Sequence, residues 1–279
     1  MRKIAVILIS FTLIASFGVL VYYAVRHSYG VPGEMEKVET VLLDVPFQDK
    51  EIDLEKGIAE DFWDGLAQKE VKLMYQAMVL PWPKQVVPSV SVNAFRNAKE
   101  IYFYLTWDDD TEDRILDVNK FSDACALMFP MDEKLQPQTL MMGFIGRANI
   151  WQWKASQDRE YWQKIKPEKN PYSDFYYPFE EKETLSVSKD EPQSAVNDLS
   201  AIRVGTITPK PIQNISGRGY FGNGGWRVVF KRSLKSDAPE IDAQFVPGKI
   251  LCAFAVWDGS KGDRGGRKSI SDWVELSIE

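Results

Sequence analysis

The sequence is short of the two residue types that supply most soft metal ligands and nucleophiles. Among 279 residues it has one histidine, His27, and two cysteines, Cys125 and Cys252. A Ser-His-Asp triad or a Cys-His pair needs a histidine beside the nucleophile, and zinc sites draw on several histidines or cysteines. Two cysteines are also too few for an iron–sulfur cluster, which usually takes four. The scarcity therefore excludes these catalytic and metal sites.

The two cysteines lie in strand-like runs among apolar neighbours. In an oxidising compartment a disulfide between Cys125 and Cys252 is one interpretation, and two separate buried thiols are the other.

No basic stripe runs along the chain. The net charge is −6, and both signs are mixed throughout the sequence, which argues against nucleic acid as a partner. Hydrophobic residues make up 44% of the chain and aromatic residues 13%, which is ample for a packed core.

One long uncharged run stands near the start of the chain. Residues 4–25 carry no charge, and 22 residues at about 1.5 Å each span roughly 33 Å, enough to cross a bilayer. Arg2 and Lys3 precede the run, so the positive-inside rule places the body of the protein outside the cytoplasm. A cleaved secretory signal is the alternative, but the run lacks a small-x-small ending. We therefore expect residues 1–29 to form an uncleaved transmembrane anchor on an extracytoplasmic, periplasmic protein.

After the Pro/Gly linker at 30–34, short β-branched and aromatic runs alternate with turn residues. This pattern predicts a mainly β fold, a β-sandwich over residues 30–279 with a few short helices. The strand-like runs are 41–45, 71–80, 87–92, 101–107, 124–129, 140–144, 149–153, 220–230, 250–257 and 273–278. Residues 156–165 and 54–68 have helical character, and 180–197 is a polar segment interpreted as a surface loop or insertion.

Two turn segments invite a functional interpretation. Asn223, Gly224 and Gly225 separate two strand-like runs and predict a hairpin turn; a phosphate-binding loop would need a helix after it. The acidic residues 108–110 follow the run 101–107 and could hold calcium or supply catalytic carboxylates. Their spacing matches no calcium loop, so a solvated acidic turn is favoured.

Residues 141–155 read MMGFIGRANIWQWKA and combine a thioether pair, a glycine turn and an alternating aromatic strand. Glycine lets the backbone approach a ligand closely, and methionine adapts to irregular space, so a large flat ligand is compatible with this segment. Plain core packing explains the same residues.

This stretch resembles the haem-binding segment of the ethylbenzene dehydrogenase γ-subunit family, the b-type cytochrome subunits of type II DMSO-reductase-family molybdoenzymes. Two further segments share the resemblance. Residues 121–130 read FSDACALMFP, like the family's strand ending in Phe-Pro, and the C-terminal segment from Ala255 to Trp273 looks like its last signature. The motifs span roughly residues 100–279 in the family's order, and the N-terminal part matches only loosely.

The resemblance implies a haem b held by a methionine thioether and a lysine amine. Met142 matches the thioether position, with Met141 as the alternative, and the amine is assigned to Lys268, with Lys231 as the alternative. A haem here would be non-covalent, because the chain has no c-type attachment pair. Only a neutral amine binds iron, and lowering a lysine pKa from near 10.4 to 7 costs about 4.6 kcal/mol. A dry pocket and the iron bond must offset that cost.

Two arginines near the second ligand fit the same cofactor. Arg264 and Arg267 could point at the haem propionates, because a guanidinium group binds carboxylates well; surface solubility is the alternative. With both axial positions filled, such a haem would transfer electrons without catalysing a reaction.

The resemblance further implies a place in a complex. The chain would pass electrons between an iron–sulfur β-subunit and an external carrier such as a soluble cytochrome, while a molybdenum-cofactor α-subunit performs the chemistry. Members serve enzymes for ethylbenzene, dimethyl sulfide, nitrite or nitrate, chlorate and selenate. A membrane-anchored β-sandwich that binds carbohydrate or another ligand without haem is the competing hypothesis.

Overall fold

The computed structural model describes residues 41–78, 80, 82, 85–117, 119–132, 140–165 and 191–279. Residues 41–279 form one compact unit. The predicted anchor, its boundary at residue 29 and residues 180–190 of the polar segment lie outside the described residues. Within the described part, no helix combines the length and apolarity needed to cross a membrane.

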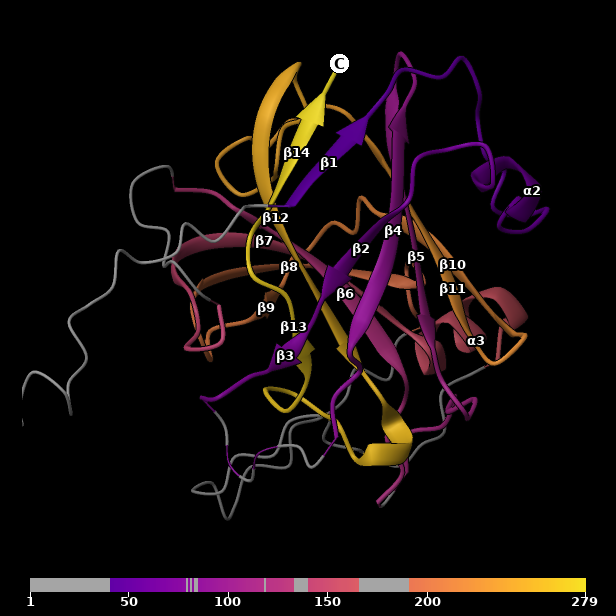
Figure 1. Ribbon diagram of the computed structural model, residues 1–279, viewed down its shortest axis with the longest axis vertical. Helices are drawn as coiled ribbons and strands as arrows, with labels where there is room; N and C mark the ends of the chain where they lie inside the picture. The colour runs from indigo at the N-terminus through magenta and orange to yellow at the C-terminus, as the bar shows by residue number, and fades with distance from the viewer. Residues whose placement is uncertain are drawn as a thin grey trace, which may run out of the picture. The chain divides into compact units, whose positions relative to one another are not determined.

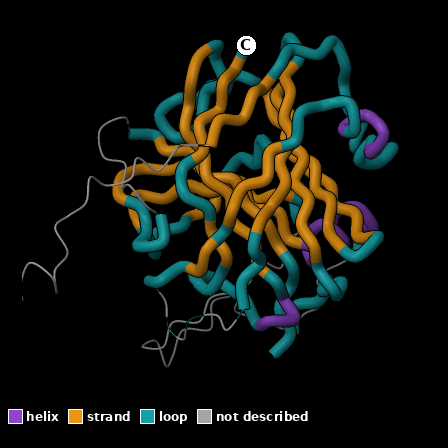
Figure 2. Tube along the Cα trace, viewed as in Figure 1, coloured by secondary structure: helices purple, strands orange, loops and turns teal. Residues whose placement is uncertain are grey.

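The described chain is mainly β, with two sheets that enclose the main core (Figures 1 and 2), which confirms the predicted fold class for this part. The larger sheet has nine described strands in the order β1-β14-β12-β6-β7-β8-β9, with β13 pairing both β12 and β3. Its strands are β1 (Val41–Val45), β3 (Met74–Tyr75), β6 (Ala124–Pro130), β7 (Ile145–Lys154), β8 (Val196–Arg203), β9 (Thr208–Pro209), β12 (Gly248–Trp257), β13 (Ser269–Ile270) and β14 (Val274–Ile278).

The smaller sheet has five described strands in the order β10-β11-β5-β4-β2. These strands are β2 (Lys69–Lys72), β4 (Ser89–Arg96), β5 (Glu100–Asp108), β10 (Ser216–Gly222) and β11 (Gly225–Ser233). Helical elements among the described residues are α2 (Glu60–Trp63), α3 (Ala155–Gln163) and the 3-10 turn η1 (Gly259–Lys261).

Large aromatic side chains from both sheets fill the space between them. Trp153 of β7 meets Trp226 of β11 edge-on, with ring centroids 4.9 Å apart, and Trp107 of β5 stacks on Trp226 at 6.3 Å. These indole rings are almost fully buried. Aromatic rings bury more apolar surface than other side chains and so contribute most to the stability of a core. This explains why the aromatic runs form strands that face the core.

The predicted hairpin turn is confirmed. Gly222 pairs with Gly225, and the two residues between them, Asn223 and Gly224, have φ angles of 51° and 75°. Positive φ at both central positions is typical of the two-residue turn that matches the twist of a β-hairpin, and Asn and Gly accept it at least cost.

Three segments differ from the sequence-based expectation. Residues 140–144 form a turn instead of a strand, because Gly143 has a φ angle of 91° and ends any extended run. Residues 71–80 divide into the short strands β2 and β3 and a following turn. Of residues 54–68 only α2 is helical, because Leu54, Ile58 and Trp63 are buried by packing onto the outer face of the smaller sheet.

Cys125 and Cys252 are separate buried thiols. Cys125 of β6 pairs with Val256 of β12 instead of with Cys252, so the register of the two strands keeps the sulfur atoms unbridged.

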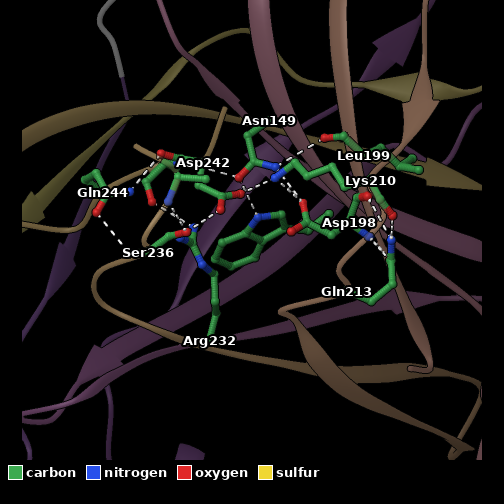
Figure 3. Close-up of polar contacts among 12 residues, drawn as sticks. Asn149, Asp198, Leu199, Lys210, Gln213, Arg232, Ser236, Asp242 and Gln244 are labelled. Atoms are coloured by element: carbon green, nitrogen blue, oxygen red, sulfur yellow. Dashed lines mark hydrogen bonds and ion pairs between the residues drawn. The ribbon is translucent and has the colours of Figure 1, made fainter. Parts of the chain in front are cut away.

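A polar network of mostly buried residues joins β7, β8 and β11 (Figure 3). Lys210 lies between two carboxylates, with 2.7 Å from its Nζ to Asp198 and a shorter contact to Asp242. The Asn149 amide donates to Asp198 at 2.8 Å, and Arg232 donates to the Ala243 carbonyl oxygen at 2.7 Å. Because Asn149 belongs to β7 and Arg232 to β11, this network links the two sheets.

Candidate functional site

The thioether pair lies on a tight turn. The N–H of Gly143 donates to the Leu140 carbonyl oxygen at 2.9 Å, so Met141 and Met142 occupy the central positions. Met142 is 59% exposed, whereas Leu140 is fully buried. A Cβ at Gly143 would lie 2.5 Å from Cγ2 of Val204 and 3.5 Å from Cγ of Met78, so this turn requires glycine for space as well as for φ.

One buried residue, Gln76, connects the thioether turn to Lys268. Its main-chain N–H donates to the Lys268 carbonyl oxygen at 3.2 Å, and its side-chain amide donates to the Leu140 carbonyl oxygen at 3.4 Å. The next residue, Ala77, donates to the Met141 carbonyl oxygen at 2.9 Å. The segments that carry Lys268 and the methionine pair are therefore neighbours in space, although strands β7 to β12 separate them in the sequence.

Lys268 immediately precedes β13, which β12 and β3 hold on its two sides. Its ammonium nitrogen lies 5.0 Å from the centre of the Trp257 ring. Among the described residues, no carboxylate pairs with it. Burial lowers the pKa of Lys268 to about 8, because the surroundings disfavour the charged form and no anion compensates.

Lys231 has the opposite environment. It lies on β11 in the other sheet and forms ion pairs with Glu51 and Glu100, both at 3.1 Å. Although partial burial opposes it, these hydrogen-bonded carboxylates raise the pKa of Lys231 above its ordinary value. Its amine is therefore held in the protonated form, which has no lone pair to donate to a metal.

The two predicted arginines contact their own loop and, for Arg264, also the segment that precedes β6. The Arg264 guanidinium lies over the Phe121 ring at 4.6 Å and donates to the Gly262 carbonyl oxygen at 2.9 Å. Arg267 donates to the Lys261 carbonyl oxygen at 3.2 Å, and its Nε is 3.6 Å from a carboxylate oxygen of Asp263.

Beside these residues, the outer face of the larger sheet carries unusually small side chains. Alanines from β6, β7, β8 and β12 share this face with a few larger apolar residues, and they form a second buried cluster with Leu140 and Trp257. The alanines are Ala124, Ala126, Ala148, Ala201, Ala253 and Ala255. Alanine projects little from a strand, and these alanines are buried, packed in one apolar cluster with Leu140 and Trp257. The alternation of alanine with large residues in 124–129 and 252–256 was a signal that our sequence analysis missed.

A cleft of about 950 Å³ lies elsewhere, on the side of α2 and α3. Its lining includes Phe62, Trp162 and Arg218 and none of the residues predicted as ligands. We attach no cofactor to this cleft.

The acidic turn after β5 is solvated only in part. Asp108 and Asp110 are exposed, as expected, but Asp109 is buried and lies against two other buried carboxylates, Asp123 and Asp258. The expectation of a solvated turn was wrong for Asp109, because residues distant in sequence cover it.

The comparison with known proteins decides the family. The sequence profile described as "Ethylbenzene dehydrogenase" matches residues 60–269, about three quarters of the chain. The chain belongs to this family.

Curated relatives of this ethylbenzene dehydrogenase family chain are named as subunits of oxidoreductases. A protein described as a respiratory nitrate reductase heme subunit, ORF7, of Haloferax mediterranei is 26% identical over 81% of this chain and 72% of its own length. The chlorate reductase subunit gamma of Ideonella dechloratans is 24% identical over 67% of this chain. The dimethylsulfide dehydrogenase subunit gamma of Rhodovulum sulfidophilum is 25% identical over 66%. The last two matches span 64% and 58% of those relatives.

Two solved structures that the chain matches at low similarity are described as carbohydrate-binding. A family 9 carbohydrate-binding module of Caldicellulosiruptor kristjanssonii in complex with cellotriose has a TM-score of 0.44 at 9% identity, covering 85% of this chain and 93% of that one. A carbohydrate-binding protein of Bacteroides uniformis has a TM-score of 0.44 at 7% identity, covering 86% and 100%.

Proposed function

We propose that this family member is the haem b electron-transfer subunit of a molybdenum oxidoreductase complex, with Met142 and Lys268 as the axial ligands. One observation carries the proposal: Lys268 is a partly buried lysine with a pKa lowered to about 8 and no carboxylate partner among the described residues, and it is anchored beside the methionine turn. The names of the relatives support the same role, because one is a heme subunit and two are gamma subunits of oxidoreductases.

The donor set suits a low-spin haem. A thioether and a neutral amine would both bind haem iron, and the alanine-rich cluster beside Leu140 and Trp257 would supply apolar surroundings for a porphyrin. When bound, a haem with two protein ligands supplies a one-electron redox centre that leaves no position open for substrate.

Each residue of the site has a separate task. Burial brings the Lys268 amine close to neutrality, so the remaining cost of deprotonation at pH 7 is roughly 1.4 kcal/mol instead of the several kcal/mol that an exposed lysine would need. Gln76 ties the backbone at Lys268 to the backbone at Leu140, which begins the methionine turn. Arg264 and Arg267 remain predicted propionate partners, and binding a propionate would require them to exchange part of their present contacts.

We also propose the wider setting. The chain would receive or deliver electrons through an iron–sulfur β-subunit bound to a molybdenum-cofactor α-subunit, with a soluble cytochrome as the external carrier. It would work on the periplasmic face of a membrane, attached by residues 1–29 or exported.

The absorption spectrum of the full chain, purified after expression with sufficient haem, tests the proposal. We expect a reducible b-type spectrum with low-spin bands, and a pyridine haemochrome assay should give about one non-covalent haem per chain. A folded but colourless protein that takes up no haem on reconstitution would refute it.

Two matched lysine variants test the ligand assignment. Lys268→Ala should convert the low-spin spectrum to a high-spin one or lose the haem. Lys231→Ala removes an amine of equal size from the other sheet and should leave the spectrum unchanged. The reverse pattern would show that the assignment to Lys268 is wrong.

A further inference from the structure

Three aspartates from distant parts of the chain meet at one end of the sandwich. Asp109 follows β5, Asp123 precedes β6 and Asp258 follows β12, so the group joins strand ends from both sheets. One carboxylate oxygen of each lies within 4.8 Å of one oxygen of the other two. Their exposed fractions are 4%, 0% and 1%. Three carboxylates so close together in a dry site repel one another unless something positive joins them.

The contacts of Asp123 favour its charged form. Its Oδ1 accepts a hydrogen bond from the Gly259 N–H at 2.8 Å, and its Oδ2 accepts from the Asp113 N–H at 2.7 Å and from the Trp226 indole N–H at 2.9 Å. A carboxylate that accepts several N–H bonds is stabilised as the anion. Burial and the nearby Asp109 oppose these bonds and raise the pKa of Asp123 to about 8, so the hydrogen bonds alone do not compensate its negative charge in the core.

Asp258 also accepts hydrogen bonds as an anion. Ser260 Oγ donates to its Oδ1 at 2.6 Å and the Lys261 N–H donates to the same oxygen at 3.2 Å, while Lys261 Nζ pairs with Oδ2 at 2.5 Å. Within the described ranges, Lys261 is the one basic residue that forms an ion pair with a member of this group, and its partner is Asp258. Its single charge balances one carboxylate of the three.

Asp109 supplies the observation that points to a ligand. The Thr111 N–H donates to its Oδ1 at 3.1 Å, but its Oδ2 is completely buried and has no hydrogen-bond partner. The indole N–H of Trp107 is also buried and lies near this carboxylate, but it makes no hydrogen bond of good geometry with any acceptor. Leaving a buried carboxylate oxygen unpartnered is costly, and native proteins rarely tolerate it without a ligand, water or ion.

We propose that Asp109, Asp123 and Asp258 bind a hard divalent cation of the calcium type. Carboxylate oxygens are the ligands that such cations prefer, and softer metals would require histidine or cysteine, which this group does not contain. The cation would fasten the ends of β5 and β12 and the start of β6. Since residues 258–268 lead directly from Asp258 to Lys268, it would also stabilise the loop that carries this lysine.

Thermal unfolding of the full chain tests the cation site without any haem readout. After dialysis against a chelator, CaCl₂ should raise the Tm by several degrees and saturate, with MgCl₂ less effective, because magnesium demands a more regular ligand shell. Terbium offers a second readout: because Trp226 contacts Asp123 directly, bound Tb³⁺ should luminesce on indole excitation, and calcium should displace it.

Asp109→Asn separates the cation from its main rival, a proton shared among the aspartates. The amide keeps the shape and the bond to Thr111 but removes the charge. If a cation binds, this variant loses the calcium shift and the terbium signal, while Asp108→Asn, an exposed neighbour, keeps both. If a proton is shared, wild type does not respond to calcium and Asp109→Asn is as stable or more stable, which would overturn the proposal. If Asp109→Asn does not fold, calcium-reversible terbium luminescence of the wild type decides. Haem-free protein serves throughout, so failure here is distinct from failure of the haem proposal.

Discussion

The ammonium nitrogen of Lys268 lies 5.0 Å from the centre of the Trp257 ring, at the end of the strand that leads into its own loop. An indole face attracts a cation by roughly 0.5 to 2 kcal/mol, which is less than a paired carboxylate would supply at the same depth. The protonated form of Lys268 is therefore only weakly stabilised at this site. This is the environment in which a lysine can change from a solubilising group to a ligand.

Replacing Lys268 by leucine should stabilise the haem-free protein at neutral pH. Because burial lowers the pKa of Lys268 to about 8 from 10.5, the folded state is penalised while the lysine is protonated. We expect a gain of roughly 1 to 3 kcal/mol in the free energy of unfolding at pH 7, measured by urea titration. Lys249→Leu, at an exposed site, should gain nothing.

The pH dependence of stability follows from the same shift. Between about pH 8 and 10.5 the unfolded chain binds a proton at Lys268 that the folded chain has lost, so stability should rise with pH across that window relative to Lys268→Leu. Below pH 8 the difference between the two proteins should be constant. A wild-type curve parallel to that of Lys268→Leu between pH 8 and 10 would show that the amine is not desolvated.

The thioether assignment can be tested among three neighbouring methionines. Met142→Leu should remove the low-spin haem spectrum, because leucine matches the volume of methionine without the sulfur. Met78→Leu is the matched control, since Met78 lies beside the same glycine and is also about half exposed. Met141→Leu should likewise retain the spectrum. A spectrum that survives in Met142→Leu and is lost in either other variant would reassign the ligand.

Lys210→Met should be strongly destabilising. The substitution leaves Asp198 and Asp242 buried without their shared cation, and breaking such a pair typically costs 3–5 kcal/mol. Lys249→Met is the control: its pair with Glu275, at 2.6 Å, is 65% exposed on the lysine side, and the change should stay within about 1 kcal/mol. Equal urea midpoints for the two variants would contradict the importance of the network in Figure 3.

Gly219→Ala should destabilise the contact between β10 and the main core. The new Cβ would lie 2.1 Å from Cζ2 of Trp153, and this indole cannot easily retreat, because its N–H is bound to Asp158 at 2.8 Å. Overpacking of this kind costs about 1–3 kcal/mol, seen as a lower Tm. Gly65→Ala meets only the Phe62 carbonyl oxygen, at 3.8 Å, and should be nearly neutral.

Much of the fold follows from local sequence. The strand runs 41–45, 101–107 and 124–129 are within a residue of β1, β5 and β6, because β-branched and aromatic residues between turn residues favour extended chain wherever they pack. The segments that were misassigned, 54–68, 71–80 and 140–144, mix apolar residues with glycine, proline or charged residues and have no clear period. Their conformation depends on which distant face buries them, and a single sequence does not contain that information.

For the candidate site, too, some features follow from the sequence and others depend on the tertiary structure. The sequence by itself determined which donors exist: one histidine, two cysteines, a methionine pair on a glycine turn and lysines as candidate ligands. Only the tertiary structure separated Lys268 from Lys231, supplied Gln76 as the link between the ligand segments and buried Asp109. Desolvation and pairing decide the pKa and the reactivity of such groups, and both depend on neighbours that are brought close only by folding.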